Sequence, residues 1–116
     1  MATIDFALAR FSHQVWKIRL KSFVNGHEDM DQSEAVSHKD CDLGKWLYST
    51  GLENFGDMAE MSQLEQTHAS LHKTVSHIIR LKNSGQMEQA QQELAKIGPL
   101  SDEVISLINA LERQIG

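Results

Sequence analysis

The chain has 116 residues, of which 41% are hydrophobic and 23% are charged, and its formal net charge is −5. This composition and length predict one globular domain, residues 1–116, large enough to bury a core without disulfides. The acidic balance argues against nucleic acid as the main partner, and no apolar run approaches the ~20 residues that span a bilayer. We therefore expect no direct membrane contact. A single cysteine and an N-terminus without a secretory signal make the cytoplasm the expected compartment.

The first predicted helix covers residues 3–24 and has two apolar stripes on nearly opposite faces. One stripe comprises Ile4, Leu8, Phe11, Val15 and Ile18, and the other comprises Phe6, Ala9, His13, Trp16, Leu20 and Phe23. A helix that is apolar on two faces is buried on two faces. In so small a domain we expect a second copy of the chain to cover one of them, which gives a homodimer through the first helix. A central helix wrapped by its own bundle is the alternative.

A long polar segment separates this helix from the next. Residues 25–40 are acidic and without a sustained period, so we expect a functional or mobile loop. Asp40 is the expected N-cap of a short helix from Cys41 to Thr50, and residues 51–56 are expected to form a turn.

The rest of the chain predicts three more helices. They cover residues 57–83, 86–97 and 100–114, and Gly98-Pro99 is expected to separate the last two. A single proline and many Ala, Leu, Glu, Gln and Lys residues favour an all-α fold. The predicted architecture is an antiparallel helical bundle with four main helices and one short Cys-bearing helix.

The residues most informative about function are His68 and His72. Both lie on the apolar stripe of the 57–83 helix, one helical turn apart. An imidazole that faces a core must be hydrogen-bonded or bound to something, and two histidines at i and i+4 commonly supply two metal ligands. Core histidines bonded to backbone or water are the simpler alternative.

Two further residues complete a candidate metal site. His13 lies on an apolar stripe of the first helix, and Cys41 is expected at the start of the short helix, where the helix dipole favours a thiolate. Three imidazoles and one thiolate suit tetrahedral Zn²⁺. The sequence therefore predicts a zinc site in the core of the bundle, formed by His13, Cys41, His68 and His72.

Three motifs in register carry a resemblance to a known family. His13-Gln-Val-Trp16, the run Cys41-Asp-Leu-Gly44-Lys-Trp46-Leu47, and His68-Ala-Ser-Leu-His72 together resemble the chemoreceptor zinc-binding domain family, known as CZB. The resemblance implies a cytoplasmic bacterial helical bundle that binds zinc through three His and one Cys and often forms homodimers. It also implies a partner such as a chemoreceptor signalling or diguanylate cyclase domain, fused or in trans.

The resemblance implies a sensor of zinc availability or of hypochlorous acid, with Cys41 as the redox-reactive residue. An oxidised Cys41 would release the metal and free the short helix, which only Leu43, Trp46 and Leu47 are placed to anchor. We expect Trp16 and Trp46 to wall the site and Gly44 to allow close approach of another helix.

Other readings of a zinc site remain open. A structural zinc that stabilises a dimerisation module is one alternative to sensing. A zinc hydrolase is disfavoured because four protein ligands leave no open coordination position and Ala-Ser-Leu at 69–71 supplies no glutamate. A di-iron bundle would need more histidines and bridging carboxylates than the core faces offer. We therefore expect a regulatory domain rather than an enzyme.

Overall fold

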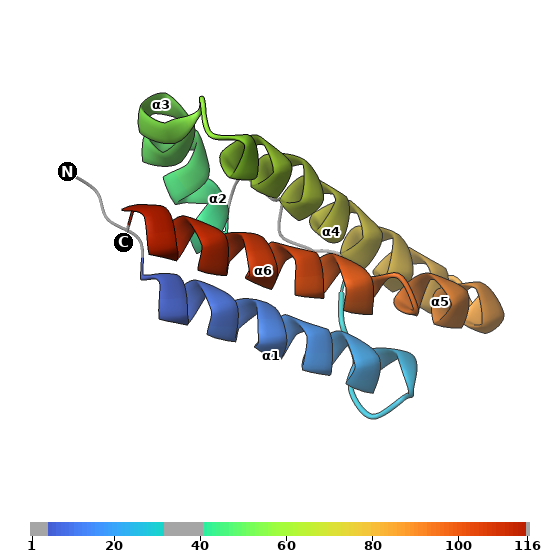
Figure 1. Cartoon of the computed structure of the whole chain (residues 1–116). Coiled ribbons are helices and arrows are strands. Elements are labelled where there is room, and N and C mark those ends of the chain that lie inside the picture. The colour runs from blue at the N-terminus through green and yellow to red at the C-terminus, as the bar shows by residue number, and fades with distance from the viewer. Residues whose placement is uncertain (1–4, 32–40, 116) are drawn as a thin grey trace.

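The computed structural model describes residues 5–31 and 41–115, and these residues form a helical bundle without strands. Three long helices, α1 (Phe6–Val24), α4 (Ala59–Asn83) and α6 (Ile97–Ile115), lie along the long axis of a body measuring 44 × 23 × 20 Å. In Figure 1, α1 and α4 run in one direction and α6 returns in the other, packed against both. The predicted all-α antiparallel bundle is confirmed.

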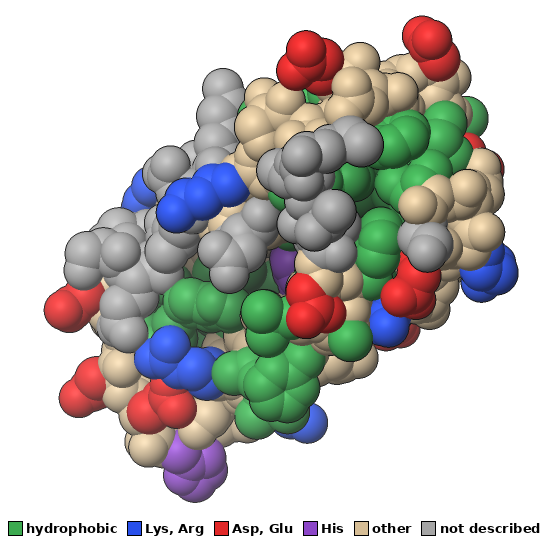
Figure 2. Space-filling model, turned by 90° about the vertical axis from the view of Figure 1, so that its left-hand side faces the viewer, with side chains coloured by type: hydrophobic (Ala, Val, Ile, Leu, Met, Phe, Trp, Pro, Cys, Tyr) green, Lys and Arg blue, Asp and Glu red, His purple; other side chains and the backbone are tan. Residues whose placement is uncertain are grey.

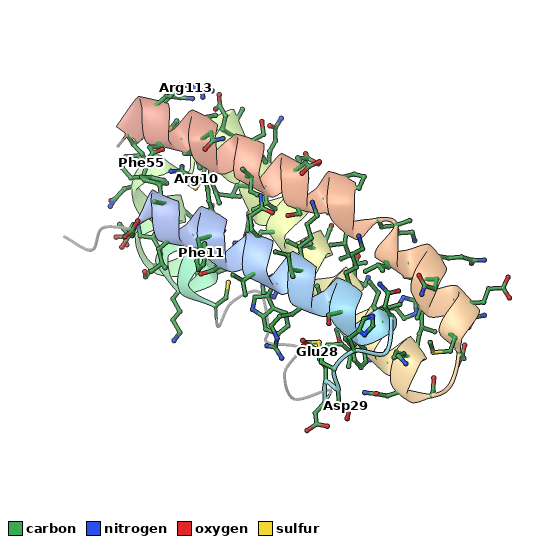
Figure 3. All side chains as sticks on the ribbon, turned by 90° about the horizontal axis from the view of Figure 1, so that it is seen from below. Arg10, Phe11, Glu28, Asp29, Phe55 and Arg113 are labelled. Carbon is green, nitrogen blue, oxygen red and sulfur yellow. The ribbon has the colours of Figure 1, made fainter. Side chains whose placement is uncertain are left out.

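Helix α1 buries only one of its two apolar stripes. The inward stripe contributes Ala9, His13, Leu20 and Phe23 to the interior. On the outer stripe Leu8, Phe11 and Ile18 are 50%, 65% and 68% exposed, and Figure 3 shows Phe11 on the side of α1 that faces away from the other helices. The helix begins at Phe6, after the Asp5 side chain that accepts from the Leu8 N–H at 3.0 Å. Ile4 and the other residues before Asp5 lie outside the described residues.

The loop after α1 is partly packed rather than wholly solvated. Gly26 has φ of +85°, a conformation that glycine adopts at little cost and that ends the helix. Met30 is only 2% exposed, and its carbonyl accepts a hydrogen bond from the Asn83 amide at 2.9 Å. The expected loop is present over residues 25–31, which form no helix, while residues 32–40 lie outside the described residues.

The Cys-bearing segment is longer and less regular than the predicted helix from Cys41 to Thr50. It consists of α2 (Asp42–Trp46), a π-helix η2 (Leu47–Gly51) and α3 (Leu52–Phe55). The turn predicted at 51–56 is therefore largely helical. The π-helix is closed by a hydrogen bond from the Leu52 N–H to the Leu47 carbonyl, five residues back.

Gly51 explains where the π-helix can lie. A Cβ at this position would be 2.9 Å from Cζ3 of the buried Trp46 ring, so only glycine lets the backbone approach the indole so closely. The indole is thereby held against the backbone of η2. The lack of a side chain at Gly51 thus helps to position a wall of the site described below.

The last three helices close the bundle. Helix α4 begins at Ala59, α5 spans Met87–Leu94, and α6 begins at Ile97, three residues before the predicted start. Gly98-Pro99 does not interrupt α6. A proline in the first turn of a helix lacks an N–H that would have no intrahelical partner there, so the helix tolerates it. The break lies earlier, after Leu94.

The core lies between α1, α4 and α6. Its fully buried side chains include Leu20, Phe23, Met61, Leu64, Ile78, Ile79, Val104, Ile108 and Leu111. At the edge of this core Arg10 of α1 donates to Asn109 at 3.0 Å and to Glu112 at 2.8 Å, both on α6. Among the described residues, none of the helices combines the length and apolar character of a membrane span.

Candidate metal centre

Three separate segments bring four potential metal ligands together. His13 comes from α1, Cys41 precedes α2, and His68 and His72 lie one turn apart on α4. One ligand atom from each residue can be chosen so that all four lie within 4.8 Å of one another. The structure thus gathers the same four residues that the sequence motifs single out.

The three imidazoles face one another edge to face. The ring centroids of His68 and His72 are 4.5 Å apart, those of His13 and His68 5.3 Å, and those of His13 and His72 6.3 Å. The interplanar angles lie between 66° and 81°. The rings therefore do not stack, and the convergence of their ligand atoms within 4.8 Å is the arrangement expected of ligands around one ion.

A backbone hydrogen bond orients the His13 ring. Its Nδ1 lies 2.8 Å from the carbonyl oxygen of Ala9, one helical turn earlier, so Nδ1–H donates and Nε2 keeps its lone pair. Burial lowers the pKa of His13, and the hydrogen bond to Ala9 opposes this only in part. The neutral ring, which is the form that binds a metal, is therefore favoured at neutral pH.

Cys41 is itself the N-cap of α2. The predicted cap, Asp40, lies outside the described residues; Cys41 Sγ accepts from the Gly44 N–H at 3.4 Å and lies 3.2 Å from His68 Nε2. Helix N-terminal N–H groups favour a thiolate. The sulfur is thus held at the histidine cluster by the helix that follows it.

The site is enclosed by the residues predicted to surround it, in partly different roles. Trp46 is 7% exposed and Trp16 is half-buried, and both line the cavity beside Cys41. Gly44 was expected to allow close helix approach; the structure shows its N–H bonded to the Cys41 sulfur. Gly51 and the Ala9 carbonyl also position the site, and no motif points to either.

The donor set fits zinc. In a tetrahedral zinc site with bonds of about 2.0–2.3 Å, neighbouring ligand atoms are about 3.3–3.6 Å apart. The Sγ–Nε2 distance of 3.2 Å between Cys41 and His68 is already close to such an edge. The remaining ligand atoms, within 4.8 Å, need only small side-chain movements to close around an ion. Imidazole and thiolate ligands favour zinc over magnesium or calcium.

The other described histidines lie away from this cluster. His27 and His77 are exposed, and His77 Nδ1 lies 3.4 Å from Glu93 on α5. His38 lies outside the described residues. His77 therefore offers a matched control for substitutions in the cluster.

Comparison with known protein families adds independent support. The model of the chemoreceptor zinc-binding domain, CZB, matches residues 13–79. The chain belongs to the CZB family. This match begins at His13 and includes Cys41, His68 and His72, and the family is one of sensory domains rather than enzymes. Comparisons with curated proteins and with solved structures gave no significant match.

Proposed function

We propose that this CZB domain binds one Zn²⁺ through His13, Cys41, His68 and His72 and signals zinc availability or oxidant exposure. The observation that carries the proposal is the convergence of the four ligand atoms within 4.8 Å. Because the ligands come from α1, α4 and the segment before α2, a bound zinc links three parts of the fold and contributes to its folding free energy.

Cys41 is the residue through which an oxidant acts in this proposal. The thiolate attacks the chlorine of hypochlorous acid; an S–Cl bond forms, the O–Cl bond breaks and hydroxide leaves. Water then displaces chloride and leaves a sulfenic acid and a proton. A sulfenic acid is a poorer zinc ligand than a thiolate, so oxidation weakens the link between α2 and the histidines.

The contacts that attach α2 to the bundle determine how far this helix can move after Cys41 is oxidised. Leu43, Trp46 and Leu47 are 2%, 7% and 0% exposed. These three side chains anchor the segment, as the sequence predicts, and the sulfur supplies a fourth attachment. Loss of the fourth attachment shifts α2 towards more open positions, while the three long helices stay packed.

Zinc binding is tested with matched histidine variants. Metal content after purification and competition with a chromophoric chelator give the affinity. We expect one zinc per wild-type chain, an affinity reduced ~100-fold or more in His68→Ala, and an unchanged affinity in His77→Ala. Wild-type affinity in His68→Ala would contradict the proposed ligand set.

Sensing is tested by stoichiometric addition of hypochlorous acid to the zinc-loaded domain. We expect zinc release to follow oxidation of Cys41, located by mass spectrometry, while helical circular dichroism is retained. A structural zinc module would keep its zinc until it unfolds, and a hydrolase would lose an activity together with the metal. A Cys41→Ala variant should keep its helices and lose the response; an unchanged response in this variant would refute the mechanism.

We further propose that a second copy of the chain covers the outer face of α1. The proposal is supported by the exposed Leu8, Phe11 and Ile18, which lie on one face of the helix. Sedimentation velocity should give a dimer that Phe11→Glu converts to monomer. Met87→Glu, at an exposed apolar residue of α5, is the control and should remain dimeric. A wild-type monomer at all concentrations tested would refute the proposal.

The proposed setting follows from the family. A chemoreceptor signalling domain or a diguanylate cyclase domain, fused or in trans, would receive the change at α2 in the cytoplasm. Pull-down of such a domain by the zinc-loaded but not the oxidised protein would identify it.

A further inference from the structure

A cavity of about 500 Å³ adjoins the metal cluster, between α1, α4, α6 and residues 41–46, and His13, Cys41 and His72 form part of its wall. Its walls are mostly apolar and include Trp16, Leu20, Leu43, Trp46, Leu71 and Val75. In Figure 2 a histidine side chain is visible at the bottom of a recess bordered by hydrophobic side chains. A volume of this size lies within the range of small-molecule pockets, about 300–1,000 Å³.

The metal cluster does not account for this space. An ion held by bonds of about 2.0–2.3 Å needs less room than one water molecule, about 30 Å³. The cavity also reaches Ile97 and Ser101 of α6, which are not part of the cluster. Most of its volume therefore remains when zinc is bound.

Ser101 is a second, independent sign of a ligand. Its side chain lines the cavity and the residue is 1% exposed, yet its hydroxyl has no hydrogen-bond partner in the described part of the chain. Buried hydroxyls are normally paired. Rotation of the Ser101 side chain towards the cavity would bring this hydroxyl to an acceptor group of a bound molecule.

Lys17 supplies a positive charge to the same cavity. Its ammonium is 4.0 Å from Asp102, whose side chain is 75% exposed, so this ion pair is weak. The Lys17 ammonium and the Ser101 hydroxyl are both donors, and together they suit a carboxylate. Asp5 and the half-exposed Leu8 also line the cavity, and they mark its open side, whereas the buried Leu20 and Ser101 mark its floor.

We propose that this cavity binds a small monocarboxylate with an apolar, ring-sized body. The carboxylate accepts from Ser101 and Lys17, and the body lies against Trp16, Leu71 and Val75. The cavity shares His13, Cys41 and His72 with the metal cluster, but the two groups proposed to bind the carboxylate, on Ser101 and Lys17, do not belong to that cluster. The domain would then respond to a small carboxylate as well as to zinc or an oxidant.

The test uses the full chain, zinc-loaded and after chelation, with benzoate as the probe and benzyl alcohol as its uncharged counterpart. Binding is followed by NMR chemical-shift titration. We expect saturable benzoate binding in both metal states, weakened about tenfold in Ser101→Ala. Lys17→Gln should weaken benzoate several-fold and leave benzyl alcohol unchanged. Lys96→Gln should change neither, because Lys96 pairs with Glu93 at 2.7 Å and does not line the cavity.

Two results would overturn the proposal. One is the absence of saturable benzoate binding to the wild type; the other is benzoate binding that Ser101→Ala and Lys17→Gln leave unaltered. Equal affinities for benzoate and benzyl alcohol would count against the carboxylate. Because the Ser101 hydroxyl is unpaired, Ser101→Ala should fold as the wild type does, and circular dichroism checks this.

Discussion

Replacing Gly51 by alanine tests whether the Trp46 wall of the metal site is held in place by close packing. The new Cβ would lie 2.9 Å from Cζ3 and 3.2 Å from two other ring atoms of Trp46. Carbon atoms in contact prefer about 3.5–4.0 Å, so the ring must retreat by several tenths of an ångström. The ring lines the cavity at the metal cluster, so its displacement alters that wall of the site.

The expected cost combines two opposing effects. Overpacking of this kind costs about 1–3 kcal/mol, and exchange of glycine for alanine in a helix recovers about 0.5–1 kcal/mol. Gly51→Ala should therefore destabilise the domain by roughly 1 kcal/mol, and by at most about 2.5 kcal/mol. For a domain of this size 1 kcal/mol corresponds to about 4 °C in Tm, so Tm should fall by about 4 °C and by at most about 10 °C.

Gly98→Ala is the matched control. Gly98 also lies in a helix, but a Cβ there has no atom within 4 Å. Because Gly98 precedes Pro99, an alanine there carries a modest backbone cost of its own, so Gly51→Ala should lose more Tm than Gly98→Ala. Thermal melts of both variants by circular dichroism, with zinc and with chelator, make the comparison; a Gly51→Ala variant at least as stable as Gly98→Ala would refute the reasoning. Trp46 fluorescence should shift in Gly51→Ala alone.

Three further predictions concern stability. Saturating zinc, at about 1,000 times its Kd, should stabilise the domain by about 4 kcal/mol, which differential scanning calorimetry would show as a Tm increase of roughly 15 °C; an unchanged Tm would contradict metal-linked folding. Arg10→Ala should cost about 0.5–1.5 kcal/mol in urea unfolding, because it removes the bonds to Glu112 and Asn109 that join α1 to α6, and a wild-type midpoint would contradict this. The pKa of Glu93 is lowered in the folded protein, chiefly by its hydrogen bond to Lys96. The ionised Glu93 therefore stabilises the fold at pH values above the pKa of the unfolded chain, and this contribution is lost as the pH falls through the pKa of the folded protein. In chelator, the Tm of Glu93→Gln should therefore fall less than that of the wild type between pH 7 and pH 4, and equal falls would refute the assignment.

Helix periodicity predicted most of the fold and three of the four candidate ligands. His13, His68 and His72 could be placed because each lies on an apolar stripe, and the exposed fractions of His68, 0%, and His13, 9%, agree with that placement. Cys41 could not be placed by periodicity, since it lies just before a helix. Only its motif joined it to the histidines.

What the sequence did not predict depends on packing between distant residues. The π-helix at Leu47–Gly51 arises where Gly51 meets the Trp46 ring, and no local propensity encodes that contact. Gly98-Pro99 reads as a helix break, but the same pair is tolerated within the first turn of α6. The unpaired hydroxyl of Ser101 becomes visible only when α6 is packed against the cavity.

The placement of Cys41 at the N-terminus of α2 determines which part of the fold changes in the proposed switch. The Gly44 N–H bonds the sulfur from within α2, whereas the histidine cluster holds it from α1 and α4. If zinc joins these two sets of contacts, loss of the metal weakens the link between the sulfur and the histidines, and the segment then depends more on Leu43, Trp46 and Leu47 for its attachment to the bundle. Trp46 in turn rests on Gly51. A change at one sulfur atom can thus reach the whole 41–55 segment without disturbing the core formed by α1, α4 and α6.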